Sequence, residues 1–323
     1  MHQVLMKILI IGRVADYNAE YFYMKYFRKF GHDVEIIDMF TGVVHRLFES
    51  LIHSRTKLFR FTLYKHEINR ILQSRVREID PDAIIVFRGE MISRKTLEII
   101  SSNFHTYLFY PDVFKFLKSI ADRLPLYDAV FTAARIQDPY MKLGARRIIN
   151  IPWACDPDFH REVPGIGKIY VVSFIGTAYP ERRRILRSIR NAEVFGDYWY
   201  GFGPRSHGPV RGENYVLTVN KTSINLNLQT KASIIGDAPT MRTYEIAGCG
   251  GFQVSDFMPS LTEFFPRMPT FKNVADLQEM LSYYSRNNSE KAEIASANRE
   301  ICYRKYTYEI MAGRILASVH MNE

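Results

Sequence analysis

The feature that most constrains the fold is a mainly apolar run near the start of the chain. Val4–Ile11 consists mainly of β-branched and aliphatic residues and ends at Gly12. Such a run is typical of a strand buried on both faces of a parallel sheet. A helix is expected next at Ala19–Phe30, and Val34–Ile37 has the pattern of a second strand. This order predicts a doubly wound α/β domain.

The same pattern begins again in the second half of the chain. Residues 152–168 are rich in proline and glycine, as interdomain linkers often are. After them, Tyr170–Ile175 is an expected strand that ends at Gly176, and Glu181–Arg190 is an expected helix. Further strands are expected at Tyr198–Tyr200, Ser223–Leu228 and Gly251–Val254.

The length of 323 residues fits two domains. We therefore expect an N-terminal Rossmann-like domain over residues 1–151, a linker over 152–168 and a second Rossmann-like domain over 169–304. Residues 305–323 are expected to form a C-terminal helix that can pack back on the first domain.

Cysteine usage and the first strand bear on the compartment. The chain has three scattered cysteines, and no pair has metal-ligand spacing. This argues against a disulfide framework or a zinc site and favours a reducing compartment. The first apolar run contains Lys7 and is too short for a signal peptide or a membrane span. We expect a cytoplasmic protein.

The net charge of +9 lies mostly in residues 1–150. Such a surplus favours anionic partners, although it also serves solubility. Residues 45–66 interleave basic and aromatic side chains. They fit either an amphipathic helix packed on the core or a peripheral contact with an anionic membrane, such as the inner membrane surface, or with a polyanion.

The first candidate site follows the strand at Tyr170–Ile175. Gly176 and Thr177 form a turn before a helix whose first turn contains Arg182 and Arg183. Backbone amides at a helix start attract anions, and guanidinium groups bind phosphate oxygens. Because basic residues at a helix start oppose the helix dipole, a bound phosphate would relieve that conflict. The alternative is an ordinary turn with solvated arginines.

The second candidate site contains Arg242 and Glu245 on a short expected helix, followed by Gly250 and Gly251. The two glycines permit a sharp turn into the next strand. A carboxylate can accept hydrogen bonds from both vicinal hydroxyls of a ribose. The alternative is a local ion pair between Arg242 and Glu245.

The stretch from Arg242 to Asp256 resembles the CgeB-like (spore-maturation type) glycosyltransferases, which are related to the family-4 GT-B enzymes. The family pattern has Arg, Glu, small residues, Cys-Gly-Gly, an apolar strand and Ser-Asp, and each part is present here. Other matching segments are Ile151–Phe159, Phe174–Thr177, Val274–Tyr284 and Lys305–Tyr308. The resemblance covers about residues 148–318.

The resemblance implies a GT-B fold, with two facing Rossmann-like domains and a cleft between them. The C-terminal domain would bind a nucleotide-diphosphate sugar as co-substrate, with no further cofactor and no metal. Glu245 would bind the ribose. Asp237 stands where family-4 relatives carry their first glutamate, so the sequence departs from the pattern there. Gly201 would lie near the nucleobase, although a plain turn explains it equally well.

The acceptor side is expected in the first domain, at the carboxyl ends of its strands. Asp16, after the first strand, and Asp112, in a segment that resembles the family's aromatic-Asp-Asp pattern, are rival candidates for the catalytic base. Other candidates for the acceptor side follow the first strand or Phe87: Gly12, Arg13, Arg88 and Glu90.

These patterns predict a glycosyltransferase that moves a sugar from a nucleotide-diphosphate donor to an acceptor hydroxyl. A retaining enzyme would need no such base. The alternatives are a non-catalytic protein that binds nucleotide or anion and contacts nucleic acid or membrane through its basic half, and a glycosyltransferase that acts on nucleic acid. The sequence leaves the donor sugar, the acceptor, the stereochemistry and the oligomeric state open.

Overall fold

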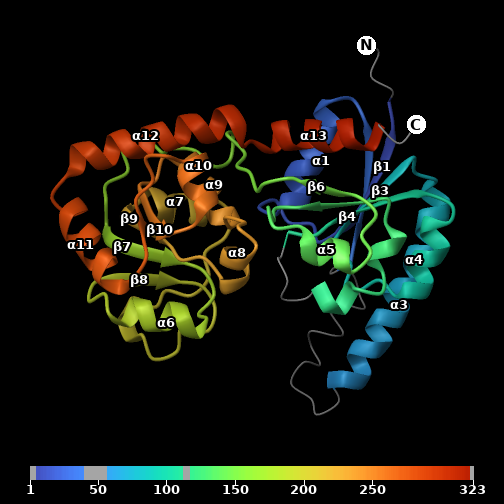
Figure 1. The fold of residues 1–323 in the computed structure, drawn as a ribbon, viewed down its shortest axis with the longest axis horizontal. Coiled ribbons are helices and arrows are strands. Elements are labelled where there is room, and N and C mark those ends of the chain that lie inside the picture. Colours follow the sequence, from blue (N-terminus) through green and yellow to red (C-terminus); the bar gives the residue numbers. More distant parts are fainter. Residues whose placement is uncertain (1–4, 40–56, 112–116, 321–323) are drawn as a thin grey trace. The chain divides into compact units, whose positions relative to one another are not determined.

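The computed structural model describes residues 5–39, 57–111 and 117–320. The chain divides into two compact units (Figure 1). Unit 1 comprises Met1–Ile151 and Ala312–Glu323, and unit 2 comprises Pro152–Met311. Each unit is built on a parallel β-sheet, as the two apolar strand runs predict.

The described part of unit 1 contains a six-stranded sheet in the order β2-β1-β3-β4-β5-β6. Its strands are β1 (Lys7–Gly12), β2 (Asp33–Asp38), β3 (Ala83–Phe87), β4 (His105–Phe109), β5 (Ala129–Thr132) and β6 (Ile148–Asn150). In the register, Gly12 lies opposite Asp38 and Ile11 opposite Val86. The carboxyl ends of β2, β1 and β3 therefore meet at one edge of the sheet.

The helices of unit 1 alternate with its strands, as the doubly wound pattern requires. Within the described residues they are α1 (Ala19–Lys29), α3 (Lys57–Ile79), α4 (Arg94–Ser101) and α5 (Asp138–Lys142), with short 3₁₀ turns at Leu117–Ile120 and Leu124–Leu126. The aromatic rings of Tyr23, Phe87 and Phe109 pack between α1 and the sheet, with the two phenylalanine centroids 4.9 Å apart.

The last helix, α13 (Tyr308–His320), begins in unit 2 and ends in unit 1. Within unit 1, the guanidinium of Arg314 donates to the Asn150 carbonyl at 2.9 Å. Arg147 donates in turn to the Ser318 carbonyl at 3.2 Å. These bonds attach the final turns of the chain to the β6 edge of the first sheet.

Unit 2 has five described strands in the order β11-β10-β9-β7-β8. They are β7 (Tyr170–Ile175), β8 (Ala192–Phe195), β9 (Thr222–Asn227), β10 (Gln253–Asp256) and β11 (Thr270–Phe271). The helices are α6 (Pro180–Arg187), α7 (Glu213–Asn220), α8 (Lys231–Ile235), α9 (Met241–Gly248), α10 (Pro259–Phe264), α11 (Val274–Tyr284) and α12 (Asn288–Lys305), with a 3₁₀ turn at Gly203–Arg205. Because β9 lies between β10 and β7, the carboxyl ends of these three strands are neighbours.

The prediction of a strand at Tyr198–Tyr200 is wrong, because the strand is β8 and ends at Phe195. The aromatic triplet has a high β-propensity. However, Gly196 (φ +138°) and Tyr198 (φ +66°) turn the chain out of the extended conformation. Tyr198 and Tyr200 are exposed, and only Trp199 of the three is buried. The triplet therefore forms part of a loop.

The loop after β8 depends on a close approach between two glycines. A Cβ atom added to Gly196 would lie 2.3 Å from the carbonyl oxygen of Gly176, and its φ of +138° is one that other residues rarely adopt. We expect Gly196→Ala to destabilise unit 2 by at least about 2 kcal/mol, through backbone strain and this clash. Calorimetric unfolding measures the effect.

The matched control is Gly167→Ala. Gly167 is exposed, and an added Cβ would have no heavy atom within 4 Å. Its melting temperature should stay within about 1 °C of wild type, since such surface changes cost little. Equal stability of the two variants would contradict the role given to Gly196.

Candidate functional site

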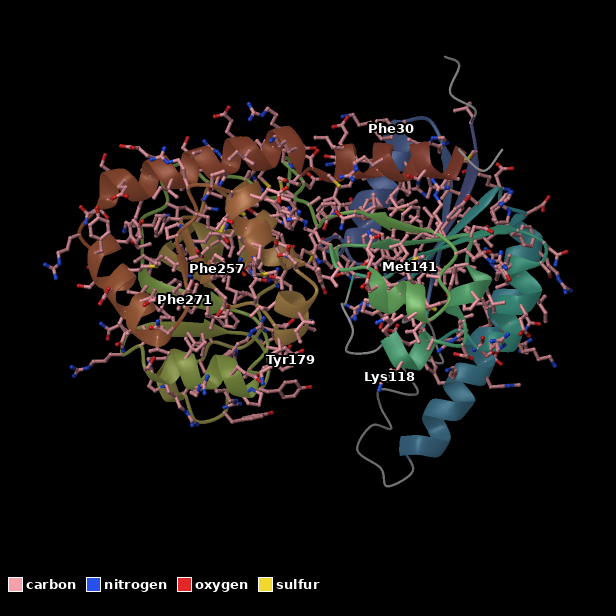
Figure 2. The ribbon with its side chains drawn as sticks, in the orientation of Figure 1. Phe30, Lys118, Met141, Tyr179, Phe257 and Phe271 are labelled. Carbon is pink, nitrogen blue, oxygen red and sulfur yellow. The ribbon has the colours of Figure 1, made fainter. Side chains whose placement is uncertain are left out.

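Several of the predicted donor-site residues of unit 2 lie at the carboxyl edge of its sheet, where open α/β sheets bind their ligands. Strand β7 runs into Gly176 and Thr177, β9 into Leu228, and β10 ends at Asp256. The predicted phosphate turn therefore lies beside the ends of β9 and β10. Figure 2 shows Tyr179, the residue before helix α6, at this side of unit 2.

Arg182, in the first turn of α6, is held at this edge by backbone carbonyls. Its Nε and Nη2 donate to the Leu228 carbonyl at 3.1 and 2.7 Å, and its Nη1 donates to the Thr177 carbonyl at 3.2 Å. The pKa of Arg182 is lowered to about 10, mainly by burial and to a smaller extent by the positive charge of Arg242, while Asp256 opposes the shift. A bound anion would favour the charged form of both guanidinium groups.

Asp256, at the end of β10, is the counter-charge of Arg182. Its Oδ2 accepts a hydrogen bond from the Gln229 backbone N–H at 2.6 Å. Burial raises the pKa of Asp256 to about 6, although Gln229 and Arg182 oppose the shift. The sequence analysis did not select this residue. The available signal was its position at the carboxyl end of an apolar strand.

Arg242 and Glu245 are joined by a short, charge-assisted hydrogen bond on helix α9. The guanidinium of Arg242 also lies 4.3 Å from the ring centroid of Tyr215. Burial alone would raise the pKa of Glu245, but Arg242 and His160 hold it at about 2. The Glu245 side chain is 2% exposed and that of Arg242 is 32% exposed. Of this pair, Arg242 is the side chain that a ligand can reach.

His160 contributes to the pair through its imidazole ring. Its Nδ1 accepts a hydrogen bond from the Asp156 backbone N–H at 3.0 Å, so the ring proton must lie on Nε2. That nitrogen is 3.6 Å from Oε1 of Glu245. Close packing here requires Gly248, because an added Cβ would lie 3.1 Å from the His160 Cβ. The sequence analysis did not select His160.

Arg183 contacts the loop after β8. It donates to the Tyr200 carbonyl at 2.8 Å and lies 5.8 Å from the Trp199 ring centroid. Gly201, in the same loop, is exposed and has a φ of +81°, with no neighbour that an added Cβ would meet. The structure therefore separates Arg183 and Gly201 from the contacts of Arg182.

Gly250 and Gly251 lie at the other end of α9 from Arg242. Gly250 has a φ of +68°, and the two N–H groups bond to the carbonyls of Ala247 and Ile246. An added Cβ on Gly251 would lie 2.8 Å from Val219. Both glycines precede β10, so they end the helix at the amino edge of the sheet. The structure does not bring them together with Arg182.

In unit 1, the acceptor-side candidates lie at the carboxyl ends of β1 and β3. Gly12 ends β1 and Arg13 follows it, while Arg88 and Glu90 follow β3. Arg88 adopts a left-handed conformation with a φ of +69°.

A buried residue that the sequence analysis did not select, Arg123, holds the loop after β3. It donates to the carbonyls of Gly89, Glu90 and Ile92. It therefore orders the segment that carries Glu90.

Of the two candidates for the catalytic base, Asp16 and Asp112, the structure describes only Asp16. Asp16 is exposed in the loop after β1. Asp112 lies outside the described residues. Most of residues 45–66 also lies outside them, and α3 begins at Lys57.

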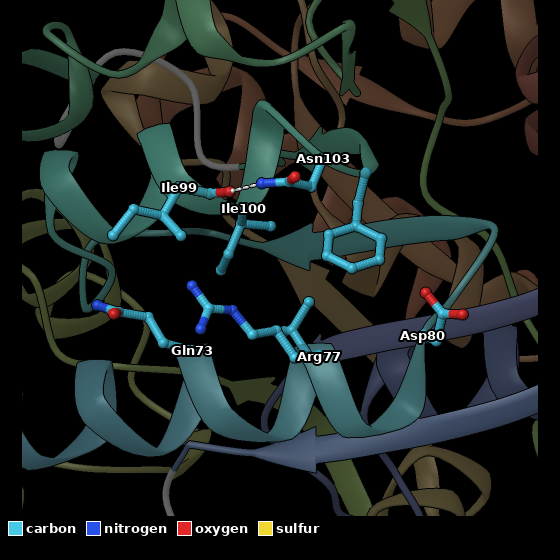
Figure 3. A pocket seen from close by; sticks show the side chains of 8 residues that line it. Gln73, Arg77, Asp80, Ile99, Ile100 and Asn103 are labelled. Carbon is cyan, nitrogen blue, oxygen red and sulfur yellow. Dashed lines mark hydrogen bonds between the residues drawn. The ribbon is translucent and has the colours of Figure 1, made fainter.

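A cavity of about 380 Å³ lies between α3 and α4, but at the other edge of the first sheet (Figure 3). Asp80 and Phe104, which line it, come just before β3 and β4. The predicted acceptor residues come after those strands. The cavity is therefore separate from the candidate site.

Residues 5–39, 57–111 and 117–320 contain no group of three or more His, Cys, Asp or Glu side chains placed to hold a metal ion. None of their helices has both the length and the apolar character that a bilayer crossing requires.

The fold places this chain with proteins that have two Rossmann-like domains. Sucrose-phosphate synthase from Thermosynechococcus elongatus has a TM-score of 0.67 at 10% identity, covering 98% of this chain and 100% of that one. A glycosyltransferase from Rickettsia africae has a TM-score of 0.62 at 10% identity, with coverage of 99% and 100%. Anabaena HepE in complex with UDP has a TM-score of 0.63 at 12% identity, with coverage of 98% and 100%. The predicted GT-B fold is confirmed.

The family comparison agrees with the fold. Residues 181–317 match the model of a family described as glycosyl transferase-like. No curated protein sequence matches. The family match and the shared fold confirm the prediction of a glycosyltransferase over that of a non-catalytic binding protein.

The raised pKa of Asp256 has a consequence for stability. Because its pKa is about 6 in the folded protein against an ordinary 3.8, the folded state holds its proton more tightly. The tighter binding of this proton stabilises the folded state below about pH 4, and this stabilisation is lost as the pH rises through about 6. Asp256→Asn keeps a hydrogen-bond acceptor and should be more stable than wild type at pH 8 by about 2 kcal/mol, with a smaller difference at pH 4. Urea unfolding at several pH values measures this.

The control is Asp197→Asn, which removes an exposed carboxylate. Its pH dependence of stability should follow that of wild type. If the stability of Asp256→Asn also followed the wild-type pH dependence, the buried Asp256 carboxylate would not destabilise the folded protein at high pH.

Proposed function

We propose that unit 2 binds a nucleotide-diphosphate sugar and unit 1 binds the acceptor whose hydroxyl receives the sugar. The observation that supports the donor assignment is the position of Arg182 and Arg242, which lie in the first turns of α6 and α9 at the carboxyl edge of the sheet. Two guanidinium groups held near each other at the carboxyl edge of a sheet are suited to a diphosphate, which carries opposite charge on several oxygens.

The start of helix α9 adds to this attraction. Thr240, which precedes the helix, makes no side-chain capping bond to it. Its hydroxyl instead faces Oδ1 of Asn227, with 3.4 Å between the oxygens. The amino terminus of a helix carries a partial positive charge and presents backbone N–H groups to anions. We place the diphosphate between this terminus, Arg242 and Arg182.

The proposed reaction forms one bond and breaks one. The acceptor oxygen bonds to the anomeric carbon of the donor sugar, and the bond from that carbon to the diphosphate oxygen breaks. Negative charge then grows on the leaving diphosphate, where Arg182 and Arg242 stabilise it. We propose that these cations serve without a bound metal or a further cofactor. In an inverting reaction, Asp16 and Asp112 are the candidate bases from the sequence.

Three finer assignments are also proposals. HepE was solved with UDP, which makes UDP the first nucleotide to test. The CgeB-like branch is supported by Asp237, whose carboxylate accepts the Ser260 N–H at 3.0 Å and so holds the start of α10. A cytoplasmic location is supported by the three cysteines, which are free and buried.

The diphosphate site is tested by calorimetric titration with UDP, GDP and dTDP. Arg182→Ala and Arg242→Ala should each weaken binding by about 10- to 100-fold, because each removes a charge-assisted contact worth about 1.5–3 kcal/mol. Arg184→Ala is the matched control, since Arg184 lies on the same helix and is exposed. No binding of any of the three nucleotides by the wild-type protein would overturn the donor assignment.

A double-mutant cycle separates a structural role of Glu245 from a ribose contact. If Glu245 acts by holding Arg242, Glu245→Gln should weaken UDP binding in the wild-type background and have little further effect in Arg242→Ala. Additive losses would instead mean that Glu245 contacts the nucleotide itself. The comparison uses the dissociation constants of the two single variants and the double variant.

A further inference from the structure

The end of strand β9 and the turn after it alternate apolar side chains with amides over residues 224–229. The apolar ones belong to a buried core cluster. Because successive side chains of a strand point to opposite faces of the sheet, the amides of the strand lie on the other face. The amides are Asn225, Asn227 and Gln229, and all three are buried. Burial of an amide costs free energy unless hydrogen bonds compensate it, so this row depends on its partners.

Gln229 is the amide of this row that lies at the candidate donor site. Its Oε1 accepts the backbone N–H of Thr240 at 3.0 Å. Its Nε2 donates to Oγ of Ser255 at 3.1 Å and to Oγ1 of Thr243 at 3.3 Å. Its backbone N–H donates to Oδ2 of Asp256 at 2.6 Å. Gln229 therefore bonds both to the end of β10 and to the start of α9.

The two cations of the site lie on either side of Gln229. The peptide group between Leu228 and Gln229 carries the carbonyl that accepts two hydrogen bonds from Arg182, at 3.1 and 2.7 Å. Because a peptide group is planar and stiff, Arg182 and the backbone N–H of Gln229 are held in fixed relation. On the other side, Gln229 holds Thr240, and Arg242 follows two residues later in the first turn of α9. Gln229 therefore links the positions of the two guanidinium groups.

We propose that Gln229 sets the spacing between Arg182 and Arg242, and that this spacing selects nucleoside diphosphates over nucleoside monophosphates. The inference rests on the proposed function and deepens it. A diphosphate has two charged phosphoryl groups and can meet both guanidinium groups at once, provided that their separation matches. A monophosphate gains little from that match. Gln229 touches no reacting atom in this account and is a positioning residue that acts through the two arginines.

A glutamine suits this position because its amide is both a donor and an acceptor. A carboxylate would lack the donors for the hydroxyls, and an apolar side chain would lack both functions. The partners of Gln229 are themselves fixed. Oγ of Ser255 donates to the Asn227 carbonyl at 2.8 Å, and Nδ2 of Asn227 donates to Oγ1 of Thr243 at 2.8 Å. Buried networks in which each member is bonded hold one arrangement, so the link between the arginines is rigid.

The first test is Gln229→Met, which keeps the side-chain length and removes its three hydrogen bonds. Calorimetric titration compares UDP with UMP, GDP with GMP and dTDP with dTMP. The affinity for the diphosphate should fall by about 10- to 100-fold, because one guanidinium no longer meets it. The affinity for the monophosphate should change by less than about 3-fold. An unchanged ratio of the two dissociation constants would overturn the role of Gln229.

The matched control is Asn220→Leu. The Asn220 side chain is also 6% exposed and also makes three hydrogen bonds, with Arg161, Val163 and Val216. However, it ends α7 just before β9, at the amino edge of the sheet. Asn220→Leu should lower the melting temperature and leave the diphosphate-to-monophosphate ratio unchanged. An equal fall of the ratio in both variants would mean general loosening of unit 2 and would overturn the positioning role.

A second variant removes the partner of the glutamine. Thr240 has a φ of −66°, the value that a proline ring imposes, so Thr240→Pro deletes the N–H that Gln229 accepts and fits the backbone. Thr240→Pro should lower the ratio by itself, which tests the link even if Gln229→Met does not fold. In the Thr240→Pro background, Gln229→Met should have little further effect. An unchanged ratio in Thr240→Pro, or fully additive losses, would overturn the link.

The outcomes also separate this inference from the proposed function. Wild-type protein that binds none of UDP, GDP and dTDP overturns both. Wild-type protein that prefers a diphosphate to its monophosphate, with the same preference in Gln229→Met, overturns the role of Gln229 alone and leaves the donor assignment standing. Wild-type protein that binds a diphosphate no more tightly than its monophosphate overturns the proposed selection.

Discussion

The confined positive charge of Arg182 is the interaction on which the second unit's site depends. A guanidinium that loses water must regain hydrogen bonds, and two backbone carbonyls, of Thr177 and Leu228, supply them. These carbonyls follow different strands, so the charge is tolerated only while β7 and β9 keep their register. Asp256 attracts this charge, although burial raises the pKa of its carboxyl to about 6.

Both units hold their functional loops by the same physical means. A long cation that is withdrawn from water binds carbonyls at the end of a strand: Arg182 in unit 2 and Arg123 in unit 1. Each carbonyl group is a fixed acceptor, so the loop gains a defined shape without regular secondary structure. Hydrogen bonds to charged groups are about twice as strong as neutral ones, which suits loops that must stay ordered beside solvent.

The sheets could be predicted from the sequence because their strands are buried on both faces. Ile8–Ile11 and Ala83–Phe87 are continuous apolar runs, and their short length and β-branched and aromatic content indicate strands. Local patterns also located the turn from Gly176 to Arg182. His160 and Asp256 were missed because their roles come from contacts between segments distant in sequence or from burial, which a linear pattern does not show. The surroundings of Glu245 likewise depend on a contact that is distant in sequence, because His160 lies 85 residues earlier in the chain.

The loop after β8 gives the protein an internal optical probe. Trp199 is one of only two tryptophans in the chain, and its indole N–H donates to the Gly176 carbonyl at 2.8 Å. The centroid of its ring also lies 5.8 Å from the guanidinium of Arg183, which donates a hydrogen bond to the Tyr200 carbonyl in the same loop. Indole emission responds to the polarity and hydrogen bonding around the ring. Binding of an anion at the Gly176 turn should therefore change the Trp199 fluorescence of the unlabelled protein. The kinetics of binding can then be followed by stopped-flow fluorescence.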